Sequence, residues 1–162
     1  MKTYTTYLDS PLGQLQVQCN ESSLVKVHFI DEPVEAVNEE HPLLQACSDQ
    51  LRKYFEGSLK RFDLPLGQQG TPFQLKVWEL LYRIPFGKTL SYNELSKRYG
   101  DVKAIRAVAS ANGRNNLAII VPCHRVIGSN ASLTGYAGGL WRKKWLLDHE
   151  AKLHSGVMEL EF

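Results

Sequence analysis

Cys123, His124 and Arg125 bring a thiol, an imidazole and a guanidinium together in three consecutive positions. They follow the apolar run 117–121 (LAIIV) and Pro122. A cysteine attacks as its thiolate, and neighbouring cations lower the thiol pKa from about 8.5 toward neutrality. These residue types at this spacing indicate nucleophilic chemistry at Cys123, with His124 as the base that activates the thiol.

A carboxylate that could orient His124 is found at Glu150, near the end of a predicted helix over residues 141–150. Leu146 and Leu147 precede it by four and three positions and share its helix face. A carboxylate on an apolar stripe is costly unless it finds a polar partner, and an imidazole would complete a Cys–His–carboxylate set. From the residues alone, a glutamate that reaches solvent at the helix end remains the alternative.

The other two cysteines are predicted to be structural. A lone cysteine is usually a small buried apolar residue, and this applies to Cys19 and Cys47. An adjacent cysteine and histidine cannot easily chelate one ion, and no C-x₂-C or H-x₃-H spacing is present, so no metal is expected. Three sparse cysteines, no signal-peptide pattern and no apolar run of about 18 residues predict a cytoplasmic protein without membrane association.

The reactive residues must be positioned by the segment before them. Residues 117–121 are apolar and β-branched at the last three positions, which predicts a buried strand that ends at Pro122. Neighbouring side chains on a strand point to opposite faces. We therefore expect His124 to reach Cys123 only through a water molecule or a local turn.

The first part of the chain has an α/β pattern. Strands are predicted over residues 3–8, 13–19, 24–30 and 61–66, with a helix over 42–56. The polar, glycine-flanked segment 67–70 (GQQG) is the best domain boundary. The predicted domains are residues 1–68 and 69–162.

The second part has a helix-turn-helix pattern. Helices are predicted from Thr71-Pro72, over 91–99 and, after an Asp101 cap, over 102–111. On the third helix an apolar side is predicted to face the core, made of Val102, Ile105 and Ala109. Its outward side is basic and made of small residues around one long arginine: Lys103, Arg106, Ala107 and Ser110.

Charge supports a nucleic-acid partner for this part. Residues 67–162 carry 13 Lys and Arg against 7 Asp and Glu, whereas residues 1–66 carry 6 against 10. A basic face of small residues can approach a phosphate backbone closely. An ordinary solvated helix face is the alternative on this evidence alone.

Taken together, these segments resemble one family. The chain carries Pro122-Cys123-His124-Arg125-Val126, then residues 135–139 (GYAGG) and 143–150 (KKWLLDHE), with Ser91-Tyr92 and 104–108 (AIRAV) upstream. This combination is similar to the O6-alkylguanine-DNA alkyltransferases. The resemblance covers the whole second part and extends more weakly to residues 8–13 (LDSPLG).

The resemblance implies a fold and an activity. The expected fold is a small N-terminal α/β domain of ribonuclease H-like type and a mostly helical C-terminal domain with a winged helix-turn-helix. The expected activity is DNA repair by direct reversal: stoichiometric, irreversible transfer of a methyl or alkyl group from O6-alkylguanine, and O4-alkylthymine, to Cys123. Each molecule would act once, as a monomer on double-stranded DNA that contains alkylated bases, without a cofactor.

The resemblance also implies residue roles. His124 would deprotonate Cys123 through a water, Glu150 would orient His124, and Asn115 would bridge the helix-turn-helix to the active-site strand. Tyr92 would donate a proton to the departing guanine, or hydrogen-bond it, at N3 and would help to rotate its phosphate. Arg106 would fill the space that the extruded base leaves. Further DNA contacts would come from Tyr92, Asn93, Ser110 and Ser129, and the base pocket from Val126, Tyr136, Ala137 and Gly138.

Two positions depart from the family pattern. Asn116 stands where the family often has proline, and Ala131 stands where it often has glycine, which affects loop dynamics rather than chemistry. The zinc ligands of some relatives have no counterpart in the N-terminal part.

Three other classes compete with repair. A relative that recognises alkylated DNA without repairing it usually has tryptophan in place of the nucleophile, which Cys123 argues against. A Cys–His hydrolase would not explain the basic helix-turn-helix. A plain winged-helix regulator would leave the Cys–His–Glu set and the glycine-rich loop unexplained.

Overall fold

The computed structural model describes residues 2–32, 34–128 and 135–159, with the side chains of the last range described to His154. The chain divides into two compact units. The first runs to Gln69 and takes in Asn116–Ala118, and the second holds Gly70–Asn115 and the chain from Ile119 onward. Residues 116–118, which fall within the second predicted domain, thus pack with the first unit.

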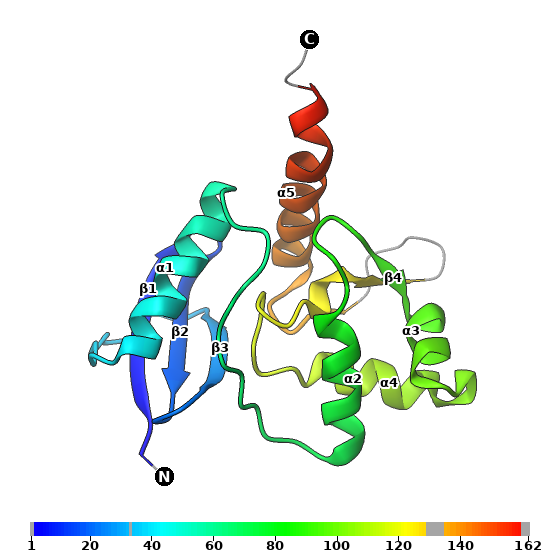
Figure 1. Ribbon diagram of the computed structural model, residues 1–162, viewed down its shortest axis with the longest axis horizontal. Coiled ribbons are helices and arrows are strands. Elements are labelled where there is room, and N and C mark those ends of the chain that lie inside the picture. The colour runs from blue at the N-terminus through cyan, green and yellow to red at the C-terminus, as the bar shows by residue number, and fades with distance from the viewer. Residues whose placement is uncertain (1, 33, 129–134, 160–162) are drawn as a thin grey trace. The chain divides into compact units, whose positions relative to one another are not determined.

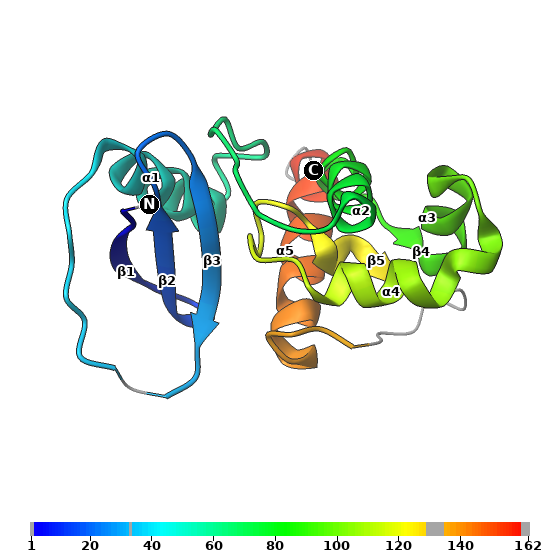
Figure 2. The same ribbon diagram turned by 90° about the horizontal axis from the view of Figure 1, so that it is seen from below.

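The first unit is an antiparallel sheet with one helix on it. Strands β1 (Tyr4–Ser10), β2 (Gly13–Cys19) and β3 (Leu24–Ile30) pair in the order β1-β2-β3. Helix α1 (Pro42–Glu56) lies across one face of this sheet in both views (Figure 1, Figure 2). The core between them is formed by alternate β2 residues and one helix stripe: Leu15, Val17, Cys19, Leu44, Cys47 and Leu51.

The outer edge of β3 accepts other parts of the chain. Val27 donates its backbone N–H to Asn116 O and accepts from Ala118 N. Leu24 bonds in the same way to Pro65 O and Gly67 N. Pairing of this kind satisfies backbone groups that an open edge would leave exposed. The predicted strand over residues 61–66 is wrong, because only Leu66 forms a bridge to the sheet.

The second unit begins with the predicted helices. They are α2 (Pro72–Tyr82), α3 (Tyr92–Tyr99), the 3₁₀ turn η1 (Val102–Ala104) and α4 (Ile105–Gly113). Capping boxes start α2 and α3, at Thr71 with Gln74 and at Ser91 with Glu94. The indole N–H of Trp78 on α2 donates to Ala111 O on α4 at 2.8 Å. This bond ties α4 to α2.

The unit is completed by short elements and one long helix. These are strand β4 (Leu90–Ser91), the 3₁₀ turn η2 (Cys123–Arg125), strand β5 (Val126–Ile127) and helix α5 (Leu140–Glu159). Strands β4 and β5 pair in parallel. A small sheet unit followed by a mostly helical one confirms the predicted fold class. No helix among the described residues has the length and apolar character that crossing a membrane requires.

The predicted core side of the third helix is wrong. Val102 and Ile105 are exposed, and the buried residues are Val108, Ala111 and Asn112. The segment begins as a 3₁₀ turn with three residues per turn, so the 3.6-residue period does not extend back to Val102. The outward side is as predicted, and Arg106 is exposed with its small neighbours Ala107 and Ser110.

The predicted strand over residues 117–121 is also wrong. Only Leu117 bridges to β3, and residues 118–120 form a turn in which Ile119 and Ile120 are buried. Ile119 has a backbone φ of 72°, a left-handed conformation that is strained for a β-branched residue. A short buried apolar run fits a strand and a buried turn equally well, so the sequence pattern could not separate them.

Candidate active site

Cys123 lies on a tight turn rather than at the end of a strand. Its backbone N–H donates to Val121 O at 2.8 Å, and the N–H of Arg125 donates to Pro122 O at 3.0 Å. Cys123, His124 and Arg125 form the 3₁₀ turn η2, and all three are buried. The strand geometry expected for these side chains is therefore replaced by that of a helical turn.

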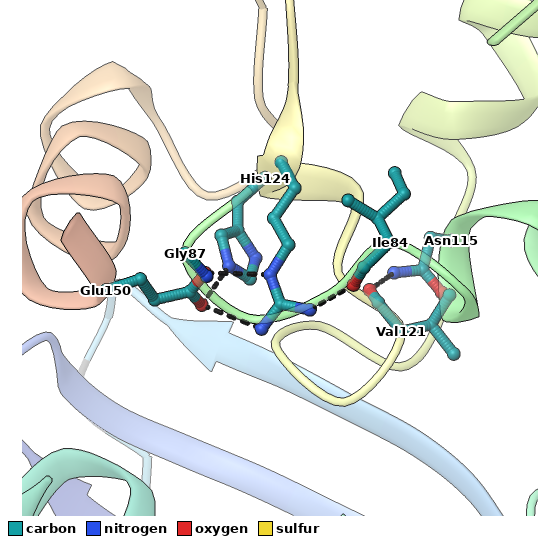
Figure 3. A network of polar contacts seen from close by, with 7 residues as sticks. Ile84, Gly87, Asn115, Val121, His124 and Glu150 are labelled. Atoms are coloured by element: carbon teal, nitrogen blue, oxygen red, sulfur yellow. Dashed lines mark hydrogen bonds and ion pairs between the residues drawn. The ribbon is translucent and has the colours of Figure 1, made fainter. Parts of the chain in front are cut away.

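The thiol is held by an amide. Asn115 Nδ2 lies 3.3 Å from Cys123 Sγ. The same nitrogen donates to Val121 O at 2.8 Å (Figure 3). Burial raises the pKa of the Cys123 thiol, while the Asn115 hydrogen bond and the nearby Lys143 ammonium oppose that rise. The surroundings thus keep the resting thiol protonated and supply two groups that stabilise the thiolate once it forms.

His124 and Glu150 meet, as the sequence suggested. His124 Nε2 lies 2.7 Å from Glu150 Oε2, and both side chains are buried (Figure 3). The alternative of a solvent-exposed Glu150 is wrong, because the residue is 1% exposed. Burial lowers the pKa of His124, although Glu150 opposes this. A neutral imidazole facing a carboxylate carries its proton on Nε2, which leaves Nδ1 as a proton acceptor. Nδ1 is buried and has no hydrogen-bond partner among the described residues.

Arg125 shares the same carboxylate. Its Nε donates to Glu150 Oε1 at 2.7 Å and its Nη2 donates to Oε2 at 3.0 Å. Its Nη1 donates to Ile84 O at 2.6 Å, and the Gly87 N–H lies 3.4 Å from Glu150 Oε1. Burial alone would raise the pKa of Glu150, but hydrogen bonds from His124 and Arg125 and attraction to the Arg125 guanidinium hold it far below its usual value. Glu150 is therefore a permanent anion.

Lys143 is a residue of the site that the sequence reasoning missed. Its side chain is fully buried, and Nζ donates to Val126 O at 2.6 Å and lies 5.9 Å from the Tyr92 ring centroid. Burial lowers the pKa of Lys143, and Cys123 opposes this. The sequence did carry an indication of this position. Lys143 precedes Leu146, Leu147 and Glu150 by three, four and seven positions, so it lies on the same face of α5.

The glycine-rich loop, residues 135–139 (GYAGG), is held by hydrogen bonds of its own. The Gly139 N–H donates to Tyr136 O at 2.8 Å, and Arg142 Nη1 donates to Gly138 O at 3.1 Å. The hydroxyl of Tyr136 is buried. Burial raises the pKa of Tyr136, and the charge of the Cys123 thiolate raises it further. Among the other predicted pocket residues, Val126 is buried and Ala137 is exposed.

The predicted DNA contacts lie on helix surfaces. Arg106 and Ser110 are exposed on α4, and Tyr92 and Asn93 are partly exposed at the start of α3. Ser129, like Ala131, lies outside the described residues. Within the part of the chain that the structure describes, no group of three His, Cys, Asp or Glu side chains could hold a metal ion.

Substitution of Gly87 tests how closely its loop packs against α5, the helix that carries Glu150. Its φ is +78°, and an added Cβ would lie 2.6 Å from His154 Cβ on α5. We expect Gly87→Ala to lower the free energy of unfolding by roughly 1–3 kcal/mol, because strain and the clash both act on the helix that carries Glu150. Chemical denaturation measures this. Gly113→Ala, a helical position with open space around its Cβ, is the control and should not destabilise.

Comparison with known proteins supports one family. Residues 72–152 match the model of the 6-O-methylguanine DNA methyltransferase DNA-binding domain, and residues 3–68 match its ribonuclease-like domain. The methylated-DNA–protein-cysteine methyltransferases of Bacillus subtilis (constitutive form) and Methanosarcina acetivorans are 47% and 45% identical to the chain. These alignments cover 85% and 91% of the chain and 88% and 97% of the relatives.

A solved structure agrees in fold. The Mycobacterium tuberculosis protein OGT in complex with DNA superimposes with a TM-score of 0.83 at 42% identity, and the match covers 92% of this chain and 93% of that chain. Both domain models, the sequence identity and the fold point the same way: the chain belongs to the 6-O-methylguanine DNA methyltransferase family.

Proposed function

We propose that Cys123 is the residue to which this protein transfers the methyl group of O6-methylguanine in DNA. The buried Cys123 thiol beside the His124–Glu150 pair carries this proposal. The thiolate attacks the methyl carbon, so an S–C bond forms while the bond from carbon to guanine O6 breaks. The electron pair stays on the base, which takes up one proton at N1 and becomes guanine.

The proton balance assigns a part to each polar neighbour. The thiol proton passes to His124 Nδ1 through one water, because Nε2 is committed to Glu150. The Asn115 amide and the Lys143 ammonium stabilise the thiolate while it forms. The proton returns to the guanine as it departs. S-methylcysteine has no free electron pair as reactive as a thiolate, so each molecule acts once.

The substrate base must leave the helical stack to reach a buried thiol, and enzymes that act on bases do this by flipping. Tyr92 then hydrogen-bonds the guanine at N3, and the pocket is lined by Val126, Tyr136, Ala137 and Gly138. Asn93, Ser110 and Ser129 hold the DNA backbone. O4-alkylthymine, and guanine with a longer alkyl group on O6, would be attacked by Cys123 in the same way.

The proposal extends to partners and organisation. The partner is double-stranded DNA with alkylated bases, bound by a monomer in the cytoplasm. The working domains are residues 1–68 and 69–162, which the matches to residues 3–68 and 72–152 support.

Mass spectrometry tests the proposal directly. The protein is incubated with a duplex that carries one O6-methylguanine, and both products are weighed. We expect a gain of one methyl per protein molecule, on the peptide that contains Cys123, and an equal loss from the DNA. A methyl on another residue, or binding without transfer, would contradict the proposal.

Substitution of Arg106 distinguishes base extrusion from the methyl-transfer step. We expect Arg106→Ala to slow repair of duplex DNA by roughly 10–100-fold, because the exposed guanidinium no longer fills the gap left by the flipped base. Reaction with free O6-benzylguanine, which needs no flipping, should stay within twofold of the unaltered protein. Lys103→Ala, an exposed neighbour on the turn that precedes α4, is the matched control and should weaken both DNA repair and binding modestly. Equal loss on duplex and free base would overturn the role of Arg106.

A further inference from the structure

We propose that Arg125 is a positioning residue that keeps His124 in its neutral, proton-accepting form by neutralising the carboxylate to which His124 is bound. This inference rests on the proposed function, because it concerns the readiness of the base that activates Cys123. The two can fail separately, since the state of His124 can be measured without any DNA.

The geometry fixes Arg125 on Glu150 more firmly than His124. Arg125 uses two nitrogens on the carboxylate, at 2.7 Å to Oε1 and 3.0 Å to Oε2, whereas His124 uses one, at 2.7 Å to Oε2. A two-point arginine–carboxylate pair is among the strong charge-assisted contacts in proteins. The Oε2 atom is therefore shared, and Glu150 is not a carboxylate that serves His124 alone.

The remaining contacts hold the guanidinium in place. Nη1 donates to Ile84 O at 2.6 Å, and the guanidinium carbon lies 5.7 Å from the centroid of the Phe86 ring. Ile84 and Gly87 both lie on the loop after α2, and both bind the pair of Arg125 and Glu150 (Figure 3). The side chain of Arg125 is buried, so solvent does not screen its charge.

The consequence for His124 follows from the charges that face it. These are Glu150 and Lys143, both on α5, and Arg125 on η2. Glu150 alone would favour an imidazolium, whose Nδ1 carries a proton and cannot accept another. The guanidinium offsets part of that attraction, and Lys143 acts in the same direction. Burial lowers the pKa of His124 in the same direction. Arg125 thereby leaves Nδ1 free to take the thiol proton at neutral pH.

The test is the pH profile of the methyl-transfer step. Single-turnover rates with an O6-methylguanine duplex are measured from pH 5 to 9 for the unaltered protein, Arg125→Lys, Arg125→Met and Arg125→Gln. The two neutral variants should move the acid limb of the profile to higher pH by about one unit, because His124 becomes easier to protonate. Arg125→Lys keeps the positive charge but cannot make the two-point contact with the Glu150 carboxylate. The acid limb of its pH profile should therefore stay in place, while its rate falls at every pH.

A second measurement needs no activity. The ring nitrogens of His124 are titrated by ¹⁵N NMR in the same proteins, with the signals assigned by loss in His124→Gln. The apparent pKa of His124 should rise in whichever neutral variant folds, by the same amount as the limb. An unshifted limb and unshifted His124 signals in a folded neutral variant would overturn the inference and leave Arg125 as a structural anchor. Absence of methyl transfer in the unaltered protein would instead overturn the proposed function, and the NMR titration would still decide the role of Arg125.

Discussion

Cys123→Ala should abolish methyl transfer to the protein while leaving the affinity for alkylated duplex DNA nearly unchanged. The thiolate is the only group in the proposed mechanism that forms a bond to the methyl carbon, so its removal takes away the reaction rather than slowing it. Cys123 is 7% exposed, whereas Arg106 and Ser110, the proposed DNA contacts, are exposed on α4, so the substitution should leave DNA binding intact. Protein mass after incubation measures transfer, and a gel-shift or polarisation assay measures binding.

The other two cysteines provide a matched control. Cys19 and Cys47 are buried and free, and burial raises the pKa of Cys47 to about 12. No polar donor comparable to Asn115 is found on either thiol among the described contacts. Cys47→Ala should therefore keep full methyl transfer and lose only packing stability, about 1–3 kcal/mol. Transfer that survives Cys123→Ala, or that depends on Cys47, would refute the assignment of the acceptor.

The sequence was sufficient where local signals are strong. Capping residues and a following glycine placed α3 correctly, between Ser91 and Gly100, and the runs predicted as strands over 13–19 and 24–30 coincide with β2 and β3. The pairing of His124 with Glu150 was also within reach, because a carboxylate on the apolar face of a helix needs a buried partner.

The failures have a common physical cause, which is tertiary context. The apolar run before Cys123 is buried, but the chain must turn back within it, and Ile119 takes a left-handed conformation that no propensity predicts. The fork of Arg125 on Glu150 joins residues 25 positions apart, so its details emerge only from the fold. Val102 and Ile105 had the spacing of a core face, but Val102 lies in a 3₁₀ turn and Ile105 is the first residue of α4, and both are exposed.

Glu150→Gln should have the largest combined effect on stability and rate. The substitution keeps the size of the side chain but removes the negative charge that faces two buried groups, the Arg125 guanidinium and the His124 imidazole. Arg125 would remain buried with an unmatched charge, which typically costs about 3–5 kcal/mol of unfolding free energy. The new amide would also present a donor toward His124 Nε2–H, which favours the tautomer with its proton on Nδ1. We expect the single-turnover rate to fall roughly 10³-fold, as for comparable losses of an orienting carboxylate.

Asp148→Asn is the matched control on the same helix. Asp148 pairs with Lys144 at 2.6 Å, but both side chains are 66% exposed, so this pair contributes at most about 0.5 kcal/mol. Its loss should leave the methyl-transfer rate unchanged. Equally small effects of the two substitutions would show that Glu150 contributes no more than an exposed ion pair does, and would contradict its orienting role.

The pH dependence of stability gives Glu150 a further signature. Its pKa is depressed in the folded protein, so its stabilisation is complete above the unfolded value of about 4.3 and is lost as the pH falls toward the folded value. The lowered pKa of His124 acts in the same direction, because below about pH 6.5 the unfolded chain binds a proton that the folded protein resists. Stability should thus rise from pH 4 to 7 in the unaltered protein. Because Glu150→Gln removes the contribution of the Glu150 charge, the difference in unfolding free energy between the two proteins should shrink as the pH falls below 4. A difference that stayed constant across that range would mean that the charge of Glu150 does not stabilise the fold.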